Sequence, residues 1–164
     1  MKSIYLAGGC FWGVEHFFSL INGVKICTTG YANGNISNPS YEEVCSTKYF
    51  FAETVKIDFD ESVIDLNKVL DKFFLIIDPT SVDQQGGDKG LQYRTGIFYE
   101  DDLDRIVANK KILELEEKYT SPIVVEVEPL KNFYKAEEYH QDYLSKNPNG
   151  YCHIPLNLFK KAND

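Results

Sequence analysis

The hydrophobic and polar positions of this chain change period several times, and each period predicts an element. Residues 4–7 form a short apolar run that is typical of a buried strand. Apolar residues then recur at intervals of three and four, the spacing of one buried face of a helix that begins at or just after Cys10. These residues are Val14, Phe17, Phe18 and Ile21. Asn22 and Gly23 follow as a turn signal, and residues 24–32 are predicted to form the next strand.

A stretch rich in Gly, Asn, Ser and Pro, residues 33–39, predicts a surface loop that leads into a short helix over 40–45. The strand expected at 52–60 then alternates, with Val55, Ile57 and Phe59 facing inward. Glu53 shares this parity. A carboxyl group that points into an apolar interior has a raised pKa and can act as a general acid near neutral pH. The alternative is that Glu53 lies at the edge of the strand and reaches water.

The second half of the chain continues with mixed periods. We expect a helix that stops before Pro79, a polar loop over 81–92, a strand over 96–100 and a helix over 101–118. The inward residues of the two helices are Leu66, Val69, Leu70, Phe73, Phe74 and Ile77, then Leu103, Ile106, Val107 and Leu113. The remaining predictions are a last strand over 123–128, partial helix over 133–145 and an irregular tail from Tyr151. Charges on the other face of the 101–118 helix are expected to be solvated.

Cys10 is the most informative candidate for chemistry. At a helix N-terminus, unpaired backbone N–H groups and the helix dipole favour a thiolate, and Gly8 and Gly9 would leave the sulfur open to a substrate. The alternative is a small buried thiol in the core, with Phe11 and Trp12 as ordinary core aromatics. Glu53 and Cys10 together would give a nucleophile and an acid.

Composition narrows the class of protein. With 164 residues, of which 43% are hydrophobic, residues 1–164 are expected to form a single domain. A net charge of −8 argues against nucleic acid and anionic membranes as partners. The first residues lack a signal-like apolar run, so we expect a cytoplasmic protein whose four cysteines are reduced at rest. No Cys-x-x-Cys is present and the histidines complete no zinc spacing, so no metal is expected.

Several motifs occur in an order that resembles the A-type peptide methionine sulfoxide reductases (MsrA). The resemblance runs from about residue 4 to residue 152, and its order makes it specific. The motifs are Gly9-Cys10-Phe11-Trp12-Gly13 followed by Glu15, Gly30-Tyr31, Asn38-Pro39-Ser40-Tyr41-Glu42-Glu43-Val44-Cys45, Ala52-Glu53, Asp78-Pro79-Thr80, Gln85-Gly86, Asp88-x-Gly90, Gln92-Tyr93-Arg94 and Phe133-Tyr134-x-Ala136-Glu137-x-Tyr139-His140-Gln141.

The resemblance implies a reductase of the S epimer of methionine sulfoxide, free or in proteins. Cys10 would attack the sulfoxide sulfur and become a sulfenic acid, and Glu53 would protonate the sulfoxide oxygen. The remaining implied site residues are Tyr41 and Tyr93 as hydrogen-bond donors, Phe11 and Trp12 as the pocket for the S-methyl group, and Asp88 as a group that shapes the site. No metal or bound organic cofactor is implied. We expect a monomer.

The resemblance also implies a resolving thiol and thioredoxin as the reductant. Cys152, in the segment Asn147-Pro148-Asn149-Gly150-Tyr151-Cys152, would form a disulfide with Cys10. Cys152 can also be an idle cysteine in a loop. The glycine-rich tail with a further cysteine, found in some members, is missing, so Cys27, Cys45 or an external thiol remain alternatives. Phe51 and Ile77 stand where many relatives have His, Asp83-Gln84 replaces Asn-Arg, and Asn33 stands where Gly is frequent.

Two other classes of function remain open at this stage. A cysteine hydrolase or acyltransferase would pair Cys10 with His140 and an orienting Asn or Asp. A non-catalytic module that only binds oxidised methionine would keep its full function in a Cys10→Ser variant. The fold expected from the sequence is the same whichever of the three functions holds. Strands and helices mix without regular β-α alternation, which predicts an α+β fold. We expect a mixed, largely antiparallel sheet packed with helices, in two layers with a ferredoxin-like core and a long irregular C-terminal segment.

Overall fold

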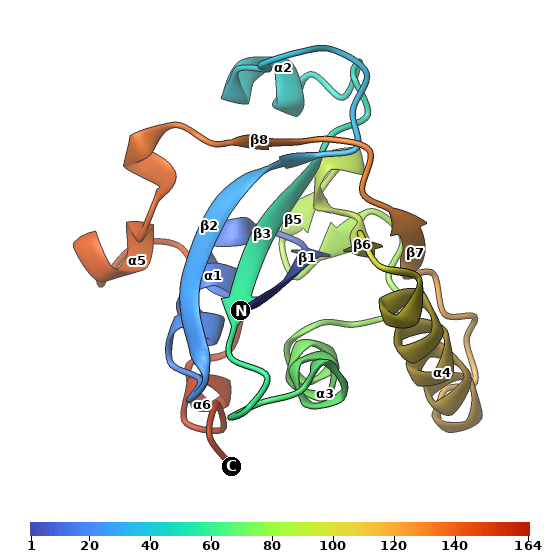
Figure 1. Ribbon diagram of the computed structural model, residues 1–164. Helices are drawn as coiled ribbons and strands as arrows, with labels where there is room; N and C mark the ends of the chain where they lie inside the picture. Colours follow the sequence, from blue (N-terminus) through green and yellow to red (C-terminus); the bar gives the residue numbers. More distant parts are fainter.

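A six-stranded sheet in the order β7-β6-β1-β3-β2-β8 forms the centre of the molecule (Figure 1). The computed structural model describes residues 1–164. The strands are β1 (Lys2–Gly8), β2 (Val24–Ala32), β3 (Ala52–Phe59), β6 (Thr95–Tyr99), β7 (Glu126–Pro129) and β8 (Phe133–Lys135). Neighbouring strands run antiparallel, except β6 and β7, which are parallel. The mixed, largely antiparallel sheet predicted from the sequence is therefore confirmed.

The helices pack around this sheet, with α1 and α3 against its central strands (Figure 1). They are α1 (Phe11–Ser19), α2 (Tyr41–Cys45), α3 (Leu66–Ile76), α4 (Asp102–Lys118), α5 (Tyr143–Lys146) and α6 (Leu156–Phe159), with single 3-10 turns at η1 (Leu91–Tyr93) and η2 (Glu138–His140). A small hairpin, β4 (Gln84–Gln85) and β5 (Asp88–Lys89), lies within the predicted 81–92 loop. None of the helices is long and apolar enough to cross a membrane.

The central strands are placed by the alternation seen in the sequence. Val55, Ile57 and Phe59 on β3 are all fully buried, as their parity predicts. β3 lies between β1 and β2, with Ile57 opposite Ile4 in the register. This pairing puts apolar side chains from neighbouring strands on one face, where α1 and α3 cover them.

The short helix α2 also begins where the sequence predicts. Ser40 accepts a hydrogen bond from the backbone N–H of Glu43 at 3.1 Å, and the Glu43 carboxylate accepts one from the N–H of Ser40 at 3.0 Å. This reciprocal capping box stabilises a helix of only five residues, which is too short to be stable by itself. The capping box therefore positions Tyr41 and Cys45 at the two ends of α2.

The predicted inward face of α4 is wrong. Leu103, Ile106 and Leu113 are exposed, and Val107 alone of the four predicted residues is half-buried against the core. The buried face instead carries Asp104 and Lys111 around Ala108. These two charged residues pack inward, whereas most other charges of α4 are exposed, as predicted. The two are buried because Lys2 of β1 pairs with Asp104 at 2.8 Å and Asp71 of α3 pairs with Lys111 at 2.6 Å. Apolar periodicity could not detect these partners.

The end of the chain also differs in part from the sequence prediction. The strand predicted over 123–128 is β7, which begins later, at Glu126. Residues 133–135, predicted to be part of a helix, form strand β8. β8 forms because it can pair with the open edge of β2, and Phe133 packs edge-on against Tyr5 at 5.1 Å. The tail contains α6, and Ile154 beside it is buried in the main core.

The corrected face of α4 leads to a stability prediction. We expect Asp104→Asn to lower the free energy of unfolding by about 1–3 kcal/mol, because the half-buried ammonium of Lys2 loses its nearer charged partner and keeps only the more distant Asp101. Leu103→Ala should change it by no more than about 0.5 kcal/mol, since Leu103 is 69% exposed. Urea unfolding of both variants measures the difference. A larger loss of stability in Leu103→Ala than in Asp104→Asn would mean that the inward face predicted from apolar periodicity was correct.

Candidate active site

Cys10 occupies the N-cap position of α1, directly after β1 and a sharp turn at Gly9. Gly9 has a φ of +85°, and a Cβ there would lie 2.6 Å from the Cβ of Gln85, so only glycine fits. The Cys10 side chain is 7% exposed. The predicted position at a helix N-terminus is confirmed.

The predicted preference of Cys10 for the thiolate is not borne out in the resting structure. Burial, followed by the charge of Glu53, raises the pKa of the Cys10 thiol well above its usual range. The backbone N–H of Trp12 points at the sulfur and lowers this pKa, but by less. The helix N-terminus is therefore outweighed by burial, and Cys10 rests as a neutral thiol.

Glu53 lies beside Cys10 although the two residues are far apart in the sequence. It faces the interior from the start of β3 and is 1% exposed, which excludes the solvent-exposed alternative. Its Oε1 accepts a hydrogen bond from the backbone N–H of Phe11, the residue after Cys10, at 3.2 Å. Burial raises the pKa of Glu53 to about 8, despite the opposing effect of that N–H. At neutral pH the site therefore contains a neutral carboxylic acid next to a thiol.

Two phenols belong to the same site. Tyr41 begins α2 and Tyr93 ends η1, and both are half-buried. Burial raises the pKa of each phenol, and the charge of Glu53 raises it further, so both stay neutral hydrogen-bond donors. The charge of Cys10 also acts on Tyr93. The structure thus brings both predicted tyrosines to Glu53, and Tyr93 also to Cys10.

The two aromatic residues after Cys10 have different surroundings. Phe11 is 1% exposed and belongs to the main hydrophobic core. Trp12 is half-buried, stacks on Tyr143 with ring centroids 3.8 Å apart, and donates its indole N–H to Nδ1 of His140 at 3.0 Å. Of the two, Trp12 alone offers a partly open apolar surface beside Cys10.

The C-terminal tail lies against the site. Oδ2 of Asp88, on β5, lies 3.8 Å from Nδ1 of His153. Burial raises the pKa of Asp88, and the hydroxyl of Tyr151, which faces this carboxyl group, lowers it by less. Cys152 contacts the first turn of α1, where a Cβ added to Gly13 would lie 3.0 Å from its sulfur. The sulfur of Cys152 also lies 3.6 Å from the carbonyl oxygen of Ile154.

The other two cysteines lie in different places. Cys27, on β2, has its pKa raised by burial and by the charges of Glu15 and Asp142, away from Glu53. Cys45 lies at the end of α2, where burial raises its pKa and hydrogen bonds to Tyr41 and Gln92 lower it. All four cysteines are free. Cys45 therefore lies near Glu53 and Cys152 near Cys10, whereas Cys27 lies near neither.

Several supporting residues received no role from the sequence. The Glu137 carboxylate accepts the hydroxyl of Tyr31 at 2.8 Å and the backbone N–H of Tyr41 at 3.0 Å, which anchors the start of α2. Gln85 accepts the N–H of Asp78 and donates to its carbonyl oxygen, at 2.9 and 2.8 Å. Their positions inside the motifs were the available signal. The partners of Glu137 lie about 100 residues away along the chain, and the contact of Gln85 with Asp78 depends on the fold of the loop between them.

The arrangement of Cys10 and Glu53 by itself defines a class of protein. A thiol and a neutral carboxylic acid at a partly apolar surface can attack an electrophilic centre and protonate its leaving oxygen, which is the chemistry of a thiol-dependent reductase. No cluster of three or more His, Cys, Asp or Glu side chains could hold a metal ion.

The model of the family described as peptide methionine sulfoxide reductase matches residues 2–164, and the chain belongs to this family. A relative from Clostridium perfringens, named peptide methionine sulfoxide reductase MsrA, is 58% identical over 158 residues, or 95% of this chain and 99% of the relative. A relative of the same name from Lachnoclostridium phytofermentans is 55% identical over 161 residues, or 98% of this chain and 97% of the relative. The resemblance seen in the motifs is confirmed.

Solved structures agree with this assignment. Mxr1 from Saccharomyces cerevisiae in reduced form matches with a TM-score of 0.89 and 43% identity, covering 94% of this chain and 91% of that chain. Mxr1 in complex with Trx2 matches with a TM-score of 0.63 and 33% identity, covering 87% and 84%. The mixed sheet and its helices are therefore shared with structures of this family.

Proposed function

We propose that this protein reduces the S epimer of methionine sulfoxide, free or in proteins, to methionine. The observation that carries the proposal is the buried Glu53 carboxyl group, bound to the N–H next to Cys10 and neutral at pH 7. A sulfoxide oxygen leaves poorly until it is protonated, and a buried neutral acid supplies that proton. Membership of the family supports the choice of substrate.

In the proposed reaction, the sulfur of Cys10 attacks the sulfoxide sulfur and Glu53 protonates the oxygen. The attack forms a transient bond between the two sulfur atoms. The S–H bond of Cys10, the S–O bond of the substrate and this transient S–S bond then break, and the hydroxyl group ends on the sulfur of Cys10. Cys10 is oxidised to a sulfenic acid as the substrate is reduced to a thioether. The proton released by the thiol replaces the one that Glu53 gave away, so the acid is restored within the turnover.

The surrounding residues take supporting roles in this proposal. Tyr41 and Tyr93 donate hydrogen bonds from neutral phenols to the sulfoxide oxygen, since their raised pKa values keep the protons in place. Trp12, backed by Phe11 in the core, forms the apolar wall for the S-methyl group. Asp88 shapes the site by holding polar partners, which in the resting protein are Tyr151 and His153.

The sulfenic acid is resolved, in our proposal, by Cys152. Its thiol attacks the sulfenic sulfur, the hydroxyl group leaves with the thiol proton as water, and a Cys10–Cys152 disulfide forms. A thioredoxin-type dithiol then reduces the disulfide, in line with the yeast relative solved with Trx2. The contact of Cys152 with the first turn of α1 supports this choice over Cys27. A groove of about 470 Å³, lined by His16, Leu156 and Phe159 among others, borders Cys152 and leaves room for a partner to approach.

The experiment that tests the scheme is thiol trapping after reaction with one equivalent of methionine sulfoxide. We expect mass spectrometry to find a Cys10–Cys152 disulfide in the parent protein. Cys152→Ser should still form one equivalent of methionine, because Cys10 and Glu53 are intact, but thioredoxin-dependent turnover should fall by about two orders of magnitude or more. Cys27→Ser is the matched control, expected to behave like the parent. A disulfide from Cys10 to Cys45, or full turnover in Cys152→Ser, would remove Cys152 from the scheme.

The alternative of a cysteine hydrolase has less support. His140, its base, uses Nδ1 to accept the indole N–H of Trp12 and packs its ring on Phe11 and Tyr41. A base committed to Trp12 through that nitrogen is poorly placed to activate Cys10. The non-catalytic alternative is tested by Cys10→Ser.

We further propose a single domain over residues 1–164 that works as a monomer in the cytoplasm. The strand order β6-β1-β3-β2, with α1 and α3 as crossover helices, supports a two-layer, ferredoxin-like core. β8 to α6 would then form the long, mostly irregular C-terminal segment. A reducing compartment suits four free thiols.

A further inference from the structure

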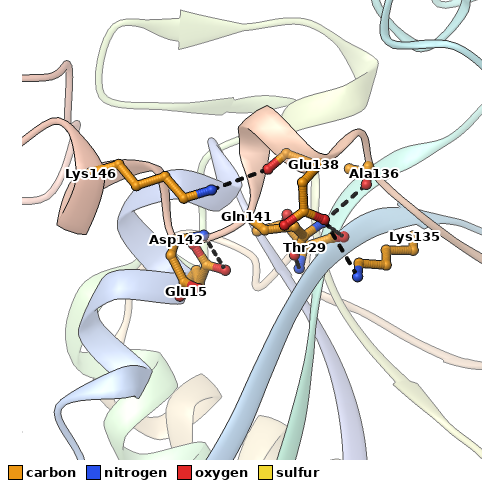
Figure 2. A network of polar contacts seen from close by, with 8 residues as sticks. All are labelled: Glu15, Thr29, Lys135, Ala136, Glu138, Gln141, Asp142 and Lys146. Atoms are coloured by element: carbon orange, nitrogen blue, oxygen red, sulfur yellow. Dashed lines mark hydrogen bonds and ion pairs between the residues drawn. The ribbon is translucent and has the colours of Figure 1, made fainter.

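Glu15 is a buried carboxylate that the proposed reaction does not use. It lies on α1 and is 1% exposed. Its Oε2 accepts a hydrogen bond from the backbone N–H of Asp142 at 3.1 Å, which is drawn in Figure 2. The backbone N–H of Tyr143 also points at this carboxylate and lowers its pKa. Glu15 therefore binds the backbone N–H of Asp142 and faces that of Tyr143, in a segment that is remote in the sequence.

These two N–H groups lie at the start of α5. Asp142 occupies the N-cap position with a left-handed φ of 54°, and its own side chain makes no capping hydrogen bond. A four-residue helix whose cap supplies no acceptor needs one from elsewhere. Glu15 provides that acceptor from α1 and so fixes the first turn of α5 onto α1.

The residue fixed in this way supports the proposed substrate wall. The ring of Tyr143 stacks on Trp12 with centroids 3.8 Å apart and planes at 13°. Trp12 is also held by the hydrogen bond that its indole N–H donates to Nδ1 of His140, at 3.0 Å. The orientation of Trp12 thus depends on where the 140–143 segment lies.

A second anchor holds the residue just before this turn. Gln141 accepts the N–H of Thr29 and donates to the carbonyl oxygens of Thr29 and Ala136, each at 3.0 Å (Figure 2). This anchor ties the segment to β2, but not to α1, which carries Cys10 and Trp12. Besides the contacts of Trp12 itself, the segment is attached to α1 by the hydrogen bond from its backbone to Glu15.

We propose that Glu15 is a positioning residue, which holds Tyr143 against Trp12 and thereby sets the apolar wall that receives the S-methyl group of methionine sulfoxide. Glu15 does not touch the substrate. Its effect is on substrate binding rather than on the chemical step, because Cys10 and Glu53 keep their own contacts without it. The inference rests on the proposed function for the part that concerns substrate.

The protonation of Glu15 adds a testable consequence. Burial raises its pKa to about 7, so below neutral pH the group becomes a carboxylic acid and loses part of its capacity to accept the N–H of Asp142. The titratable groups that face or adjoin it are Asp142 and Lys146 from the 142–146 segment, Cys27 from β2, and His16 on α1. Burial lowers the pKa of His140, which adjoins Trp12, so its titration falls at a lower pH.

The test uses the fluorescence of Trp12, which is the only tryptophan of the chain. We expect Glu15→Ala to move its emission to longer wavelength in the absence of substrate, as Tyr143 separates from it. The KM for methionine sulfoxide should rise about tenfold with kcat within about twofold of the parent, since only positioning is lost. In the parent protein, emission and KM should both change between pH 8 and pH 6, with a midpoint near 7. Glu15→Gln should show intermediate values without that midpoint.

Asp104→Asn is the matched control, a buried carboxylate on α4 that pairs with Lys2. It should lower stability but leave the emission of Trp12 and KM unchanged. Parent-like emission and KM in Glu15→Ala, a loss in kcat alone, or the same changes in Asp104→Asn would overturn the proposal. If Glu15→Ala does not fold, the pH profile of Glu15→Gln serves as the test. A midpoint near 7 in the emission and KM of Glu15→Gln, as in the parent, would contradict the proposal. The emission is read without substrate, so failure of this inference is distinguishable from failure of the proposed function.

Discussion

Replacement of Cys10 by serine is expected to abolish the reduction of methionine sulfoxide, with kcat/KM falling by about four orders of magnitude or more. A serine hydroxyl is a far weaker nucleophile and can form neither a sulfenic acid nor a disulfide. The side chain is nearly the same size and the N-cap position accepts serine, so the fold should persist. The measurement is methionine formed with a dithiol reductant, with circular dichroism as the test of folding.

The matched control for this variant is Cys27→Ser, since Cys27 is a half-buried thiol away from Glu53. It should keep activity close to that of the parent. If Cys10→Ser still reduces sulfoxide, or still binds it as its whole function, the nucleophile has been misassigned and the binding-module alternative returns.

The second large effect is expected for Glu53→Gln, which should lower kcat by about two to four orders of magnitude, the range for a lost general acid. The amide can still accept the N–H of Phe11, so the local geometry is kept while the acidic proton is lost. In the parent, activity should fall as pH rises through about 8, because Glu53 loses its proton there. The residual activity of Glu53→Gln should lack this fall. A parent-like pH profile in the variant would assign the proton donor elsewhere.

The same carboxyl group affects stability, with a definite sign. Its pKa is raised from 4.5 to about 8 in the folded protein, so the folded state binds the proton more tightly than the unfolded state does. This contribution is fully present below pH 4.5 and is lost as pH rises through about 8. Glu53→Gln should therefore remove a slope of about 1.4 kcal/mol per pH unit from the free energy of unfolding over this window.

The sequence was sufficient for the central strands and for the relation between Cys10 and Glu53. The alternation of apolar and polar residues along β3 predicted which side chains face the core, and the helical spacing of apolar residues after Cys10 predicted the start of α1. Both predictions succeeded because they depend only on neighbouring residues. Their convergence follows once β3 and β1 pair, since β1 leads directly into Cys10. Strand parity could not decide between a buried and an edge position for Glu53, which depends on α1 covering it.

Other features depend on partners that are distant along the chain. The inward face of α4 is determined by Lys2 and Asp71, so a search for apolar spacing selects the wrong residues. The thiolate expected at the helix N-terminus is outweighed by burial and by Glu53, which a local motif does not reveal. β8 is too short to show a strand period and forms because the edge of β2 is available.

The protonation state of Glu53 tests the central claim most directly. The carboxyl carbon of Glu53, labelled with ¹³C and assigned by its absence in Glu53→Gln, is followed by NMR as pH is raised in the reduced, substrate-free protein. We expect a midpoint near 8, with the acid neutral beside the Cys10 thiol at pH 7. A midpoint near the ordinary 4.5 would mean an ionised carboxylate at neutral pH and would contradict the proposed proton donor.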